Sequence, residues 1–454
     1  MFGKTEHIHF VGIGGIGMSG LAIVLHNLKF KVTGSDINRT DITRNLRKKD
    51  IKVFYNHEKS NITGADVVVY STAIKKGNPE ITEARRINIP IIHRGEMLAE
   101  LTRMKIAVCV SGTHGKTTTT SIIGEILEKG GFMPTTVIGG IIKGKSQAKF
   151  GKGDYLVCEA DESDKSFLRL YPSYAVISNI EAEHLDHYRD LDEIKENFIY
   201  FANHVPFWGC TFLGVDFPSS FEIRDNIYRR TITYGFNERA ELRVTKITRS
   251  NKGCSFNVTY RDKSVGRFNI NLLGNHNISN TLAAIGVGIE LGVPKVKIKK
   301  ALAEFRGVHR RIEFVGEVAG VKIFDDYGHH PTEIAVTLET IHTYFPKRRI
   351  ISVFQPHRYT RTYHLFDDFA LSFLNADIVI VSKIYGAHEI PIPGVSGKAL
   401  AKRISKDQNN VHFIAEIDDI LIFLKKVAQR DDIIVIQGAG SINHLAKRLL
   451  KELP

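Results

Sequence analysis

A chain of 454 residues is longer than one hydrophobic core usually organises, so we expect two to four domains, with three as the central expectation. Its 43% hydrophobic and 24% charged residues are typical of an ordinary globular protein. No stretch reaches the roughly 18 apolar residues of a membrane helix, and the first residues lead into a strand instead of a signal peptide. We therefore expect a cytoplasmic protein with no membrane insertion.

The net charge of +13 at pH 7 would permit nucleic-acid binding. The basic residues are dispersed, however, and no nucleic-acid-binding motif accompanies them, so we expect acidic small-molecule ligands and no nucleic acid. The four cysteines show neither a C-x-x-C pair nor zinc-site spacing, and they are Cys109, Cys158, Cys210 and Cys254. We interpret them as reduced and mostly buried.

The first hundred residues alternate apolar strands with helical segments. Strands are expected at 7–14, 30–36, 51–56 and 65–74, with helices from about residue 18, at about 40–50 and after residue 80. This rhythm predicts a parallel sheet with crossover helices. The polar stretch Leu101–Thr102–Arg103 interrupts it before a new apolar strand and predicts a domain boundary.

The next block has apolar strands at 106–112, 155–161 and 174–180, each running into polar residues at its carboxyl end. Open α/β sheets place their ligands at such ends. Short alternating segments between about 230 and 272 predict an added antiparallel sheet, and helices follow at 277–292 and 295–305. A second boundary is expected at 306–311. The rest again alternates strand and helix, with strands at 320–328, 348–356, 376–384 and 432–441.

The first predicted strand ends in a glycine-rich turn. The segment HFVGIGGIGMSG places G-x-G-x-x-G at Gly12, Gly14 and Gly17, and Asp36 follows about one strand–helix unit later. This pattern is typical of a dinucleotide site, where glycines let the backbone approach a diphosphate at a helix N-terminus. A tight turn without a ligand has the same pattern. The motif therefore indicates a diphosphate more securely than it indicates a nicotinamide.

The strongest motif is VSGTHGKTTTT at residues 110–120, where an apolar strand runs into a glycine-rich turn and then a helix. Backbone N–H groups of such a turn encircle phosphate oxygens, Lys116 neutralises charge, and the hydroxyl of Thr117 reaches Mg²⁺. The spacing is G-x-x-G-K-T, shorter than the usual motif, because position 110 is Val. We interpret this segment as a nucleoside triphosphate site.

Triphosphate chemistry requires a divalent cation with oxygen ligands. The segment CEADESD supplies carboxylates directly after a strand, with Glu159 nearest the strand end and Asp161, Glu162 and Asp164 beyond it. A second candidate, NIEAEHLDHY, supplies His184, Asp186 and His187. Taken alone, the first segment is as typical of a solvent-exposed acidic turn as of a metal site. The second segment, taken alone, is more typical of polar surface residues than of a metal site.

Seven blocks occur in a characteristic order, namely GTHGKTTTT, EADESDKSFLRLYP, SNIEAEHLDHY, LLGNHNISNTLAA, GVHRRIE, DDYGHHPTE and FQPHRYTRT. Together with VGIGGIGMSGLA, GSD, STAI, NPE and HRGEML in the first domain, they resemble the Mur ligase family over essentially the whole chain. The resemblance implies three α/β domains: an N-terminal Rossmann-like UDP-binding domain at 1–103, a central P-loop-type ATPase domain at 104–307 with a parallel and a small antiparallel sheet, and a C-terminal Rossmann-like domain at 308–454.

The resemblance also implies an amide ligation in two steps. ATP phosphorylates a carboxylate, and an amino group then displaces phosphate from the acyl phosphate. Within the family, the blocks are most similar to members that attach L-alanine to UDP-N-acetylmuramate in peptidoglycan precursor synthesis. The implied ligands are ATP, UDP-N-acetylmuramate, L-alanine and Mg²⁺, with two ions expected. The C-terminal domain is expected to bring the amino acid and to close over the ATP site, in a monomer or a homodimer.

Site residues carry over from the family by motif. Residues that would hold ATP are Gly112, Thr113, His114, Gly115, Lys116, Thr117 and Thr118, with His276, Asn277 and Asn280 at the adenine and Asp326 at the ribose. Metal ligands would be Thr117, Glu159 and His184. Lys116, His184 and Arg311 would act in catalysis. The UDP-sugar would meet Gly12, Gly14, Gly15, Gly17, Asp36 and Ser71. The amino acid would meet Tyr327, His329, His357, Arg358 and Arg361.

Alternatives remain for several of these assignments. Asn277 would serve equally as a helix cap, and Arg311 or Asp326 as part of an interdomain salt bridge. No carbamylated lysine is assigned. Rival functions are a sibling ligase that adds a murein tripeptide to UDP-N-acetylmuramate, a nicotinamide dehydrogenase, and a nucleotide-binding regulatory protein without catalysis.

Overall fold

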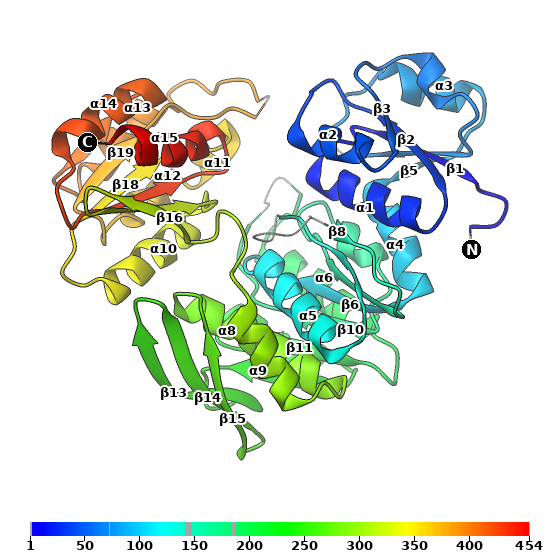
Figure 1. The fold of residues 1–454 in the computed structure, drawn as a ribbon, viewed down its shortest axis with the longest axis horizontal. Helices are drawn as coiled ribbons and strands as arrows, with labels where there is room; N and C mark the ends of the chain where they lie inside the picture. The colour runs from blue at the N-terminus through cyan, green and yellow to red at the C-terminus, as the bar shows by residue number, and fades with distance from the viewer. Residues whose placement is uncertain (1, 72, 141–147, 184–186, 388, 454) are drawn as a thin grey trace. The chain divides into compact units, whose positions relative to one another are not determined.

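A computed structural model describes residues 2–71, 73–140, 148–183, 187–387 and 389–453 (Figure 1). The chain divides into two compact units: residues 1–247, 255–270 and 277–306 form the first, and residues 248–254, 271–276 and 307–454 form the second. Each unit contains α/β structure. The chain forms three sheets one after another along the sequence, as expected for an α/β chain of three domains. Within the described residues, no helix is long and apolar enough to cross a membrane.

The N-terminal part of the first unit is a five-stranded parallel sheet in the order β3-β2-β1-β4-β5. Its elements are β1 (His7–Val11), α1 (Ile16–Asn27), β2 (Lys31–Ser35), α2 (Asp41–Arg47), β3 (Lys52–Phe54), η1 (Lys59–Ile62), β4 (Val67–Tyr70), α3 (Pro79–Arg86), β5 (Ile91–His93) and α4 (Arg94–Met104). The predicted strand–helix rhythm is confirmed. The strand order reverses at β1, so the glycine turn after β1 lies where doubly wound sheets bind ligands.

Residues 101–103, where a domain boundary is expected, lie within α4, which continues to Met104. Thr102 is buried there, and its hydroxyl donates to the carbonyl of Ala99 at 2.7 Å. Its polarity is satisfied inside the helix. A polar side chain that is bonded to its own helix therefore does not end it.

A buried carboxylate connects three elements of this sheet. Glu80, in α3, is fully buried and accepts hydrogen bonds from Ser35 Oγ and Asn61 Nδ2, both at 2.6 Å. His57 Nδ1 lies 2.9 Å and His9 Nε2 lies 3.6 Å from its oxygens. Burial raises the pKa of Glu80, but the hydrogen bonds from His9, Ser35 and Asn61 outweigh burial and hold the pKa below its usual range.

The central part of the first unit is built on a ten-stranded sheet in the order β15-β14-β13-β12-β11-β10-β6-β9-β7-β8. Its elements are β6 (Ile106–Ser111), α5 (Lys116–Gly130), β7 (Thr135–Val137), β8 (Ala148–Lys149), β9 (Tyr155–Glu159), η2 (Ser166–Arg169), β10 (Tyr174–Ile177), α6 (Leu191–Asn203), β11 (Cys210–Gly214), α7 (Pro218–Glu222), η3 (Arg224–Asn226), β12 (Thr231–Gly235), β13 (Leu242–Ser250), β14 (Gly253–Tyr260), β15 (Lys263–Ile270), α8 (Asn275–Glu290) and α9 (Lys295–Glu304).

The predicted antiparallel addition corresponds to β13, β14 and β15. Neighbouring strands joined by only two residues must run antiparallel, since a parallel pair needs a long crossover. Arg261 and Asp262, which join β14 to β15, have φ of 47° and 60°. Positive φ at both positions is the geometry of a tight hairpin turn whose twist matches that of the strands.

Aliphatic and aromatic side chains of β1, α1, β6, β9, β10 and α6 form one continuous core in the first unit. The centre of this core contains two cysteines side by side, because Cys109 on β6 pairs in register with Cys158 on β9. Their Sγ atoms lie 3.6 Å apart, and all four cysteines are free and buried. The expectation of reduced, buried cysteines is confirmed.

The second unit is centred on a six-stranded sheet in the order β16-β17-β21-β18-β19-β20. Its elements are β16 (Glu313–Val318), β17 (Val321–Asp326), α10 (Pro331–Tyr344), β18 (Ile350–Phe354), α11 (Tyr359–His364), α12 (Phe366–Leu371), β19 (Ile378–Val381), α13 (Gly397–Ile404), β20 (Val411–Phe413), α14 (Ile417–Val427), β21 (Ile433–Gln437), η4 (Ser441–Asn443) and α15 (His444–Glu452). Helices cover both faces over two separate cores, and all pairs except β16–β17 are parallel.

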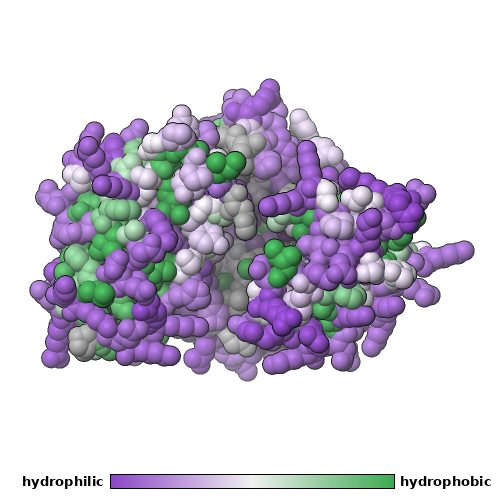
Figure 2. Space-filling model, turned by 90° about the horizontal axis from the view of Figure 1, so that it is seen from above, coloured by the Kyte–Doolittle hydropathy of each residue, from purple (hydrophilic) through white to green (hydrophobic). Residues whose placement is uncertain are grey.

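Hydrophilic residues dominate the face of the molecule drawn in Figure 2, with hydrophobic residues in small groups among them. This distribution agrees with the composition. Single exposed apolar side chains are ordinary on globular proteins.

Candidate active site

The phosphate-loop segment connects β6 to α5, as its sequence predicts. Gly112 has φ of 129°, and Gly115, the N-cap of α5, has φ of 85°. Both values lie in the region that favours glycine. Lys116 and Thr117 occupy the first turn of α5, where unpaired backbone N–H groups and the helix dipole favour an anion.

Two residues after β10 hold this loop from one side. Asn179 accepts from the His114 N–H through Oδ1 at 2.8 Å and donates through Nδ2 to the His114 carbonyl at 3.0 Å. Ser178 Oγ donates to the same carbonyl at 2.5 Å, and a Cβ added at Gly112 would lie only 2.1 Å from this Oγ. The sequence motifs did not assign Ser178 or Asn179. The Asn179 amide and the Ser178 hydroxyl hold the backbone of the loop in place through these hydrogen bonds to His114.

Asn280, on α8, holds the loop from another side. Its Oδ1 accepts from Thr119 Oγ1 at 3.1 Å, and a Cβ added at Gly115 would lie 2.3 Å from the same Oδ1. Asn280 and Asn277 are both buried, and Nδ2 of Asn280 lies 3.4 Å from Oδ1 of Asn277. His276 lies in the same first turn of α8. Asn280 therefore contacts the first turn of α5 and lies close to Gly115, and Asn277 lies beside Asn280.

Replacing Gly115 by Ala is expected to destabilise the loop and to impair nucleotide binding strongly. The added methyl would meet Asn280, and alanine at φ of 85° costs about 1–2 kcal/mol even without a clash. Gly131, the C-cap of the same helix, has φ of 90° and nothing within 4 Å of its added Cβ, so Gly131→Ala is the matched control. Calorimetric titration with ADP would compare them. Equal affinities in both variants would contradict the assigned role of the Asn280 contact.

Lys116 makes an ion pair with a carboxylate of the acidic segment. Its Nζ donates to Glu162 Oε1 at 2.6 Å and to the carbonyls of Gly112 and Thr113 at 2.7 and 3.2 Å. Glu162 is almost fully buried, and burial raises its pKa to about 7, helped by Asp161 and opposed by Lys116. Burial tends to lower the pKa of Lys116, but Glu162 and Asp161 outweigh it and keep the ammonium charged. The sequence left Glu162 unassigned.

Asp161 pairs with Arg94, the first residue of α4. Arg94 Nη2 donates to Asp161 Oδ2 at 2.6 Å, and Ser163 donates to Oδ1 from both N–H and Oγ. Burial would raise the pKa of Asp161, yet the charges of Arg94 and Lys116 prevail and hold this pKa at about 2. Adjacent carboxyl groups of one segment thus have pKa values far apart, which is common at functional sites.

Glu159 is the last residue of β9, and β9 pairs with β6 so that Glu159 lies opposite Val110. Its Oε1 accepts from the Gly139 N–H at 2.7 Å. Thr117, the other assigned oxygen ligand, is in the first turn of the helix that follows β6. Both assigned oxygen donors therefore lie at or beyond the carboxyl ends of neighbouring strands, and this donor set fits Mg²⁺. His184 and Asp186 lie outside the described residues.

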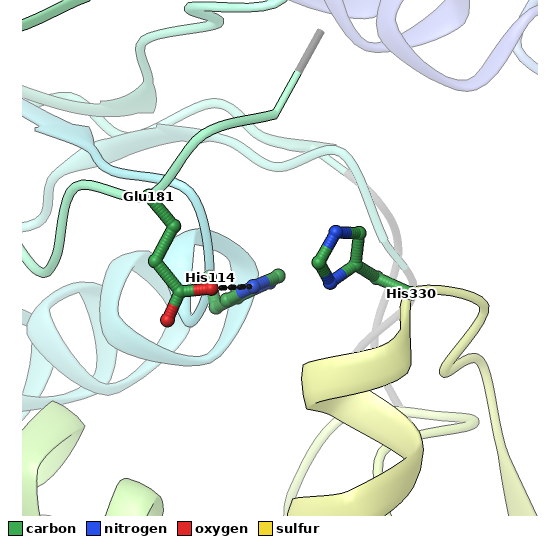
Figure 3. A group of neighbouring side chains, drawn as sticks. All are labelled: His114, Glu181 and His330. Atoms are coloured by element: carbon green, nitrogen blue, oxygen red, sulfur yellow. Dashed lines mark ion pairs between the residues drawn. The ribbon is translucent and has the colours of Figure 1, made fainter. Parts of the chain in front are cut away.

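His114, within the loop, forms an ion pair with Glu181, which follows β10 (Figure 3). His114 Nε2 is 3.3 Å from Glu181 Oε2. The Glu181 N–H donates to Thr113 Oγ1 at 2.9 Å, so the segment after β10 is bonded to the loop a second time. Glu181 therefore gives a carboxylate at the loop that the sequence motifs did not assign.

The N-terminal glycine turn has a specific internal contact. Gly12 has φ of 80°, Gly15 is the N-cap of α1 and Gly17 lies in its first turn. Asp36 does not project freely: its Oδ2 accepts from the Gly14 N–H at 2.9 Å, and its Oδ1 accepts from the Asn38 N–H. The carboxylate therefore stabilises the turn. Ser71, directly after β4, accepts through its carbonyl from the Ile74 N–H.

In the second unit, Asp326 closes the turn before β16. It is buried, and its carboxylate accepts from the N–H groups of Ile312 and Gly328, both at 2.8 Å, and from Thr337 Oγ1 at 3.2 Å. Burial raises its pKa. Arg311 Nη1 lies 3.3 Å from Glu333 Oε1, and its guanidinium lies over the Tyr327 ring.

Glu333 is a further residue of this region that the motifs left out. It accepts from the N–H groups of His329 and His330, and the latter contact belongs to a capping box at the start of α10 with His330 as N-cap. The four residues HPTE contain the signal, since an N-cap followed by glutamate at the third helical position is a helix-start pattern. Glu333 thereby orients the backbone beside His329.

The predicted amino-acid residues of the second unit include a histidine that stays neutral. His357 stacks on Tyr385 with ring centroids 5.6 Å apart, and His329 is 5.9 Å away. Burial, with the charges of His329, Arg361 and Arg358, lowers the pKa of His357 to about 3. Arg361 Nη1 donates to its Nδ1 at 3.3 Å. Positive charge in this group therefore comes from arginine, while His357 orients Arg361.

Family comparisons cover nearly the whole chain. Residues 7–106 match the model described as Mur ligase family, catalytic domain, residues 110–288 match Mur ligase middle domain, and residues 310–440 match Mur ligase, glutamate ligase domain. A protein named UDP-N-acetylmuramate--L-alanine ligase from Desulfatibacillum aliphaticivorans is 46% identical over 453 residues, covering 99% of each chain.

Two solved structures are similar over nearly the whole length. The UDP-N-acetylmuramate-alanine ligase of Thermotoga maritima has a TM-score of 0.82 and 30% identity, covering 98% of both chains. A murein peptide ligase of Psychrobacter arcticus has a TM-score of 0.74 and 24% identity, covering 99% of this chain and 98% of that one, and shows a common fold. With three consecutive family matches and these relatives, the chain belongs to the Mur ligase family.

Proposed function

We propose that this chain joins L-alanine to the carboxylate of UDP-N-acetylmuramate, giving UDP-N-acetylmuramoyl-L-alanine, ADP and phosphate in peptidoglycan precursor synthesis. The observation that carries the proposal is full-length similarity to relatives named for this reaction, combined with a phosphate loop in which Lys116 is in place. A non-catalytic relative would be expected to have lost Lys116, Thr117, Glu159 or His184, and the sequence has all four.

The chemistry requires activation of the acid. A carboxylate oxygen attacks the γ-phosphorus of ATP, the bond to the β-phosphate oxygen breaks, and an acyl phosphate and ADP result. The amino nitrogen of L-alanine, after losing a proton, attacks the acyl carbon, and phosphate leaves as the amide forms. Phosphate is a far better leaving group than oxide, so ATP cleavage is coupled to bond formation.

Residues of the first unit supply the triphosphate site in this proposal. The loop 112–118 surrounds the phosphates, and Lys116 neutralises charge on the transferring group. The adenine is assigned to His276, Asn277 and Asn280, near the start of α8. Fixed donors and cations lower the barrier because they are already oriented where charge develops. Arg311 and Asp326, from the second unit, complete the assignment at the γ-phosphate and the ribose.

Magnesium ions belong to the proposal as well. Thr117 and Glu159 would hold one ion and His184 a second, and the ions would reduce the repulsion between the γ-phosphate and the substrate carboxylate. The oxygen donors of Thr117 and Glu159 fit this role, since they lie at or beyond the carboxyl ends of neighbouring strands.

The amino-acid site is assigned to Tyr327, His329, His357, Arg358 and Arg361. Guanidinium groups suit the carboxylate of L-alanine because their planar donors match its two oxygens. The neutral His357 contributes by holding Arg361. UDP-N-acetylmuramate is assigned to the glycine turn at residues 12–17, with Asp36 and Ser71. The domain limits 1–103, 104–307 and 308–454, the cytoplasmic location, and a monomer or homodimer complete the proposal.

Phosphate release distinguishes the amino acid from the tripeptide as acceptor. With ATP, Mg²⁺ and UDP-N-acetylmuramate, L-alanine is expected to support turnover with kcat/KM at least about a hundredfold above that of L-alanyl-γ-D-glutamyl-meso-diaminopimelate. Glycine and L-serine serve as size controls. Turnover with the tripeptide alone would replace this proposal by the sibling activity. Oxidation or reduction of a nicotinamide without phosphate release would contradict ligase chemistry altogether.

A further inference from the structure

The first turn of α4 lies between two assigned anion sites of the first unit. A Cβ placed on Gly17, in the glycine turn, would lie 3.0 Å from Nη1 of Arg94. The other end of the same guanidinium, Nη2, donates to Asp161 Oδ2 at 2.6 Å. The two amino groups of one side chain therefore face the UDP-sugar turn and the acidic segment of the ATP site.

Within the described part of the chain, the contacts of the Arg94 guanidinium use only some of its N–H donors. Among the described residues, its hydrogen bond runs from Nη2 to Asp161, and a weaker ion contact reaches Asp164 at 3.8 Å. An arginine carries five N–H donors in a rigid plane, so one edge can hold a carboxylate while the other meets a phosphate. The side chain is 27% exposed, which leaves it reachable by a ligand at the glycine turn.

Asp161 connects this arginine to the phosphate-transfer residues. It lies two residues after Glu159 and directly before Glu162, the partner of Lys116. Its second oxygen is occupied by Ser163, so the carboxylate is held in one orientation. A shift of the Arg94 guanidinium would therefore move Asp161. The same segment carries Glu159, the assigned metal ligand, and Glu162, the partner of Lys116.

The rest of α4 packs tightly on the same segment. A Cβ at Gly95 would lie 2.5 Å from Cβ of Ser166, and the Tyr171 N–H donates to Thr102 Oγ1 at 3.1 Å. Arg103 donates to the Tyr171 hydroxyl at 2.6 Å, whereas the exposed pair of Glu96 with Arg169 contributes little to this attachment. Since residues 161–171 are attached to α4 along its length, the helix and the acidic segment form one mechanical element.

We propose that Arg94 binds the diphosphate of the UDP-sugar through its Nη1 edge and, through Asp161, couples occupancy of that site to the geometry of the Glu159–Lys116 nucleotide site. Arg94 is thereby a binding residue at the diphosphate and a positioning residue for phosphoryl transfer, and Asp161 is a positioning residue. The inference rests on the proposed function for the identity of the UDP-sugar. Coupling of this kind is reciprocal, so each ligand must change the affinity of the other by the same factor.

Calorimetric titration of the full chain with UDP-N-acetylmuramate, in the absence and presence of saturating ADP and Mg²⁺, tests the inference. The unaltered chain is expected to bind the UDP-sugar at least about fivefold more tightly with ADP bound. Arg94→Gln is expected to weaken UDP-sugar binding about tenfold or more and to bring the coupling factor close to one. Asp161→Asn should leave UDP-sugar affinity nearly unchanged yet remove the coupling. Glu96→Gln, which breaks the surface pair of the same helix, is the control and should change neither.

The outcomes separate clearly. A coupling factor of one in the unaltered chain, or wild-type coupling in both Arg94→Gln and Asp161→Asn, overturns the inference. Should Arg94→Gln fail to fold, Arg94→Lys keeps the charge but loses the planar fork, and wild-type coupling in that folded variant counts against the proposal. Binding does not require turnover. A chain that binds and couples both ligands but releases no phosphate with L-alanine contradicts the proposed function alone, whereas absence of UDP-sugar binding contradicts both.

Discussion

Replacing Lys116 by Ala is expected to reduce kcat for phosphate release by about a thousandfold or more. The substitution removes the cation assigned to the transferring phosphoryl group, and loss of one preoriented electrostatic group at a reacting centre has effects of this size. It also leaves Glu162 buried without its 2.6 Å partner. The pKa of Glu162, already raised by burial, should then rise further, because the stabilising charge is gone.

Lys129→Ala provides the matched control for this substitution. Lys129 lies on the same helix, α5, and pairs with Glu304 at the surface, where an ion pair contributes little. A second variant, Lys116→Ala with Glu162→Gln, removes the unpaired buried carboxylate and should recover stability without recovering turnover. Near-normal phosphate release by Lys116→Ala would refute the phosphate-loop assignment. Recovery of turnover in the double variant would show that the single variant had failed through misfolding.

Replacing Glu80 by Ala is expected to destabilise the N-terminal sheet by about 3 kcal/mol. The change leaves the donors of buried Ser35 and Asn61 and of half-buried His57 without their acceptor and opens a cavity under β1. Breaking a buried network by removing one partner has costs of this order. Hydrogen exchange of the full chain, followed by mass spectrometry, should show faster exchange in β1, β2 and α3, by about two orders of magnitude where opening is local.

The acid dependence of this stability follows from the same carboxylate. Glu80 has a pKa below its usual 4.5 in the folded chain, so it contributes stability that is present above that value and lost as pH falls through the lower folded pKa. Glu80→Ala should lose this acid-sensitive part. Glu83→Gln on the same helix, which breaks an exposed pair with Arg86, is the control. Unchanged exchange in β1 for Glu80→Ala, beside the same result for Glu83→Gln, would contradict the role of the network.

Much of the fold follows from local pattern. Alternating apolar strands and helices predict parallel sheets in the first and last parts of the chain, and short alternating segments predict the hairpins β13 to β15. The expected break at residues 101–103 rested on the polarity of Thr102 and Arg103, while the compensating bond from Thr102 to the Ala99 carbonyl exists only once the helix is formed. The three-residue strand β5 was missed. Its stabilisation comes from pairing with β4, and so short a segment has little periodicity of its own.

The candidate site likewise has residues that a local motif predicts and residues that only the fold brings together. Gly112, Gly115 and Lys116 belong to a contiguous motif whose geometry is local, so the sequence alone predicts the strand–loop–helix arrangement in which they lie. Asn179 carries no comparable signal, because one asparagine after a strand is commonplace and its two bonds to His114 join residues 65 positions apart. Glu162 was left unassigned for a related reason: only the folded chain shows which carboxylate of the acidic segment meets Lys116. The assignments themselves, including His184, stay predictions.

The way the phosphate loop is held also constrains when it can form. Residues 112–118 are synthesised early, yet their shape depends on Ser178 and Asn179 and on Asn280. A growing chain must therefore extend past α8 before the loop has all of its supports, and chains fold as units when such distant partners have emerged. During translation, about 160 further residues must be added before Asn280 can support the segment assigned to the nucleotide. A truncated product that ends before Asn280 would consequently contain the whole glycine-lysine motif and still lack a finished loop.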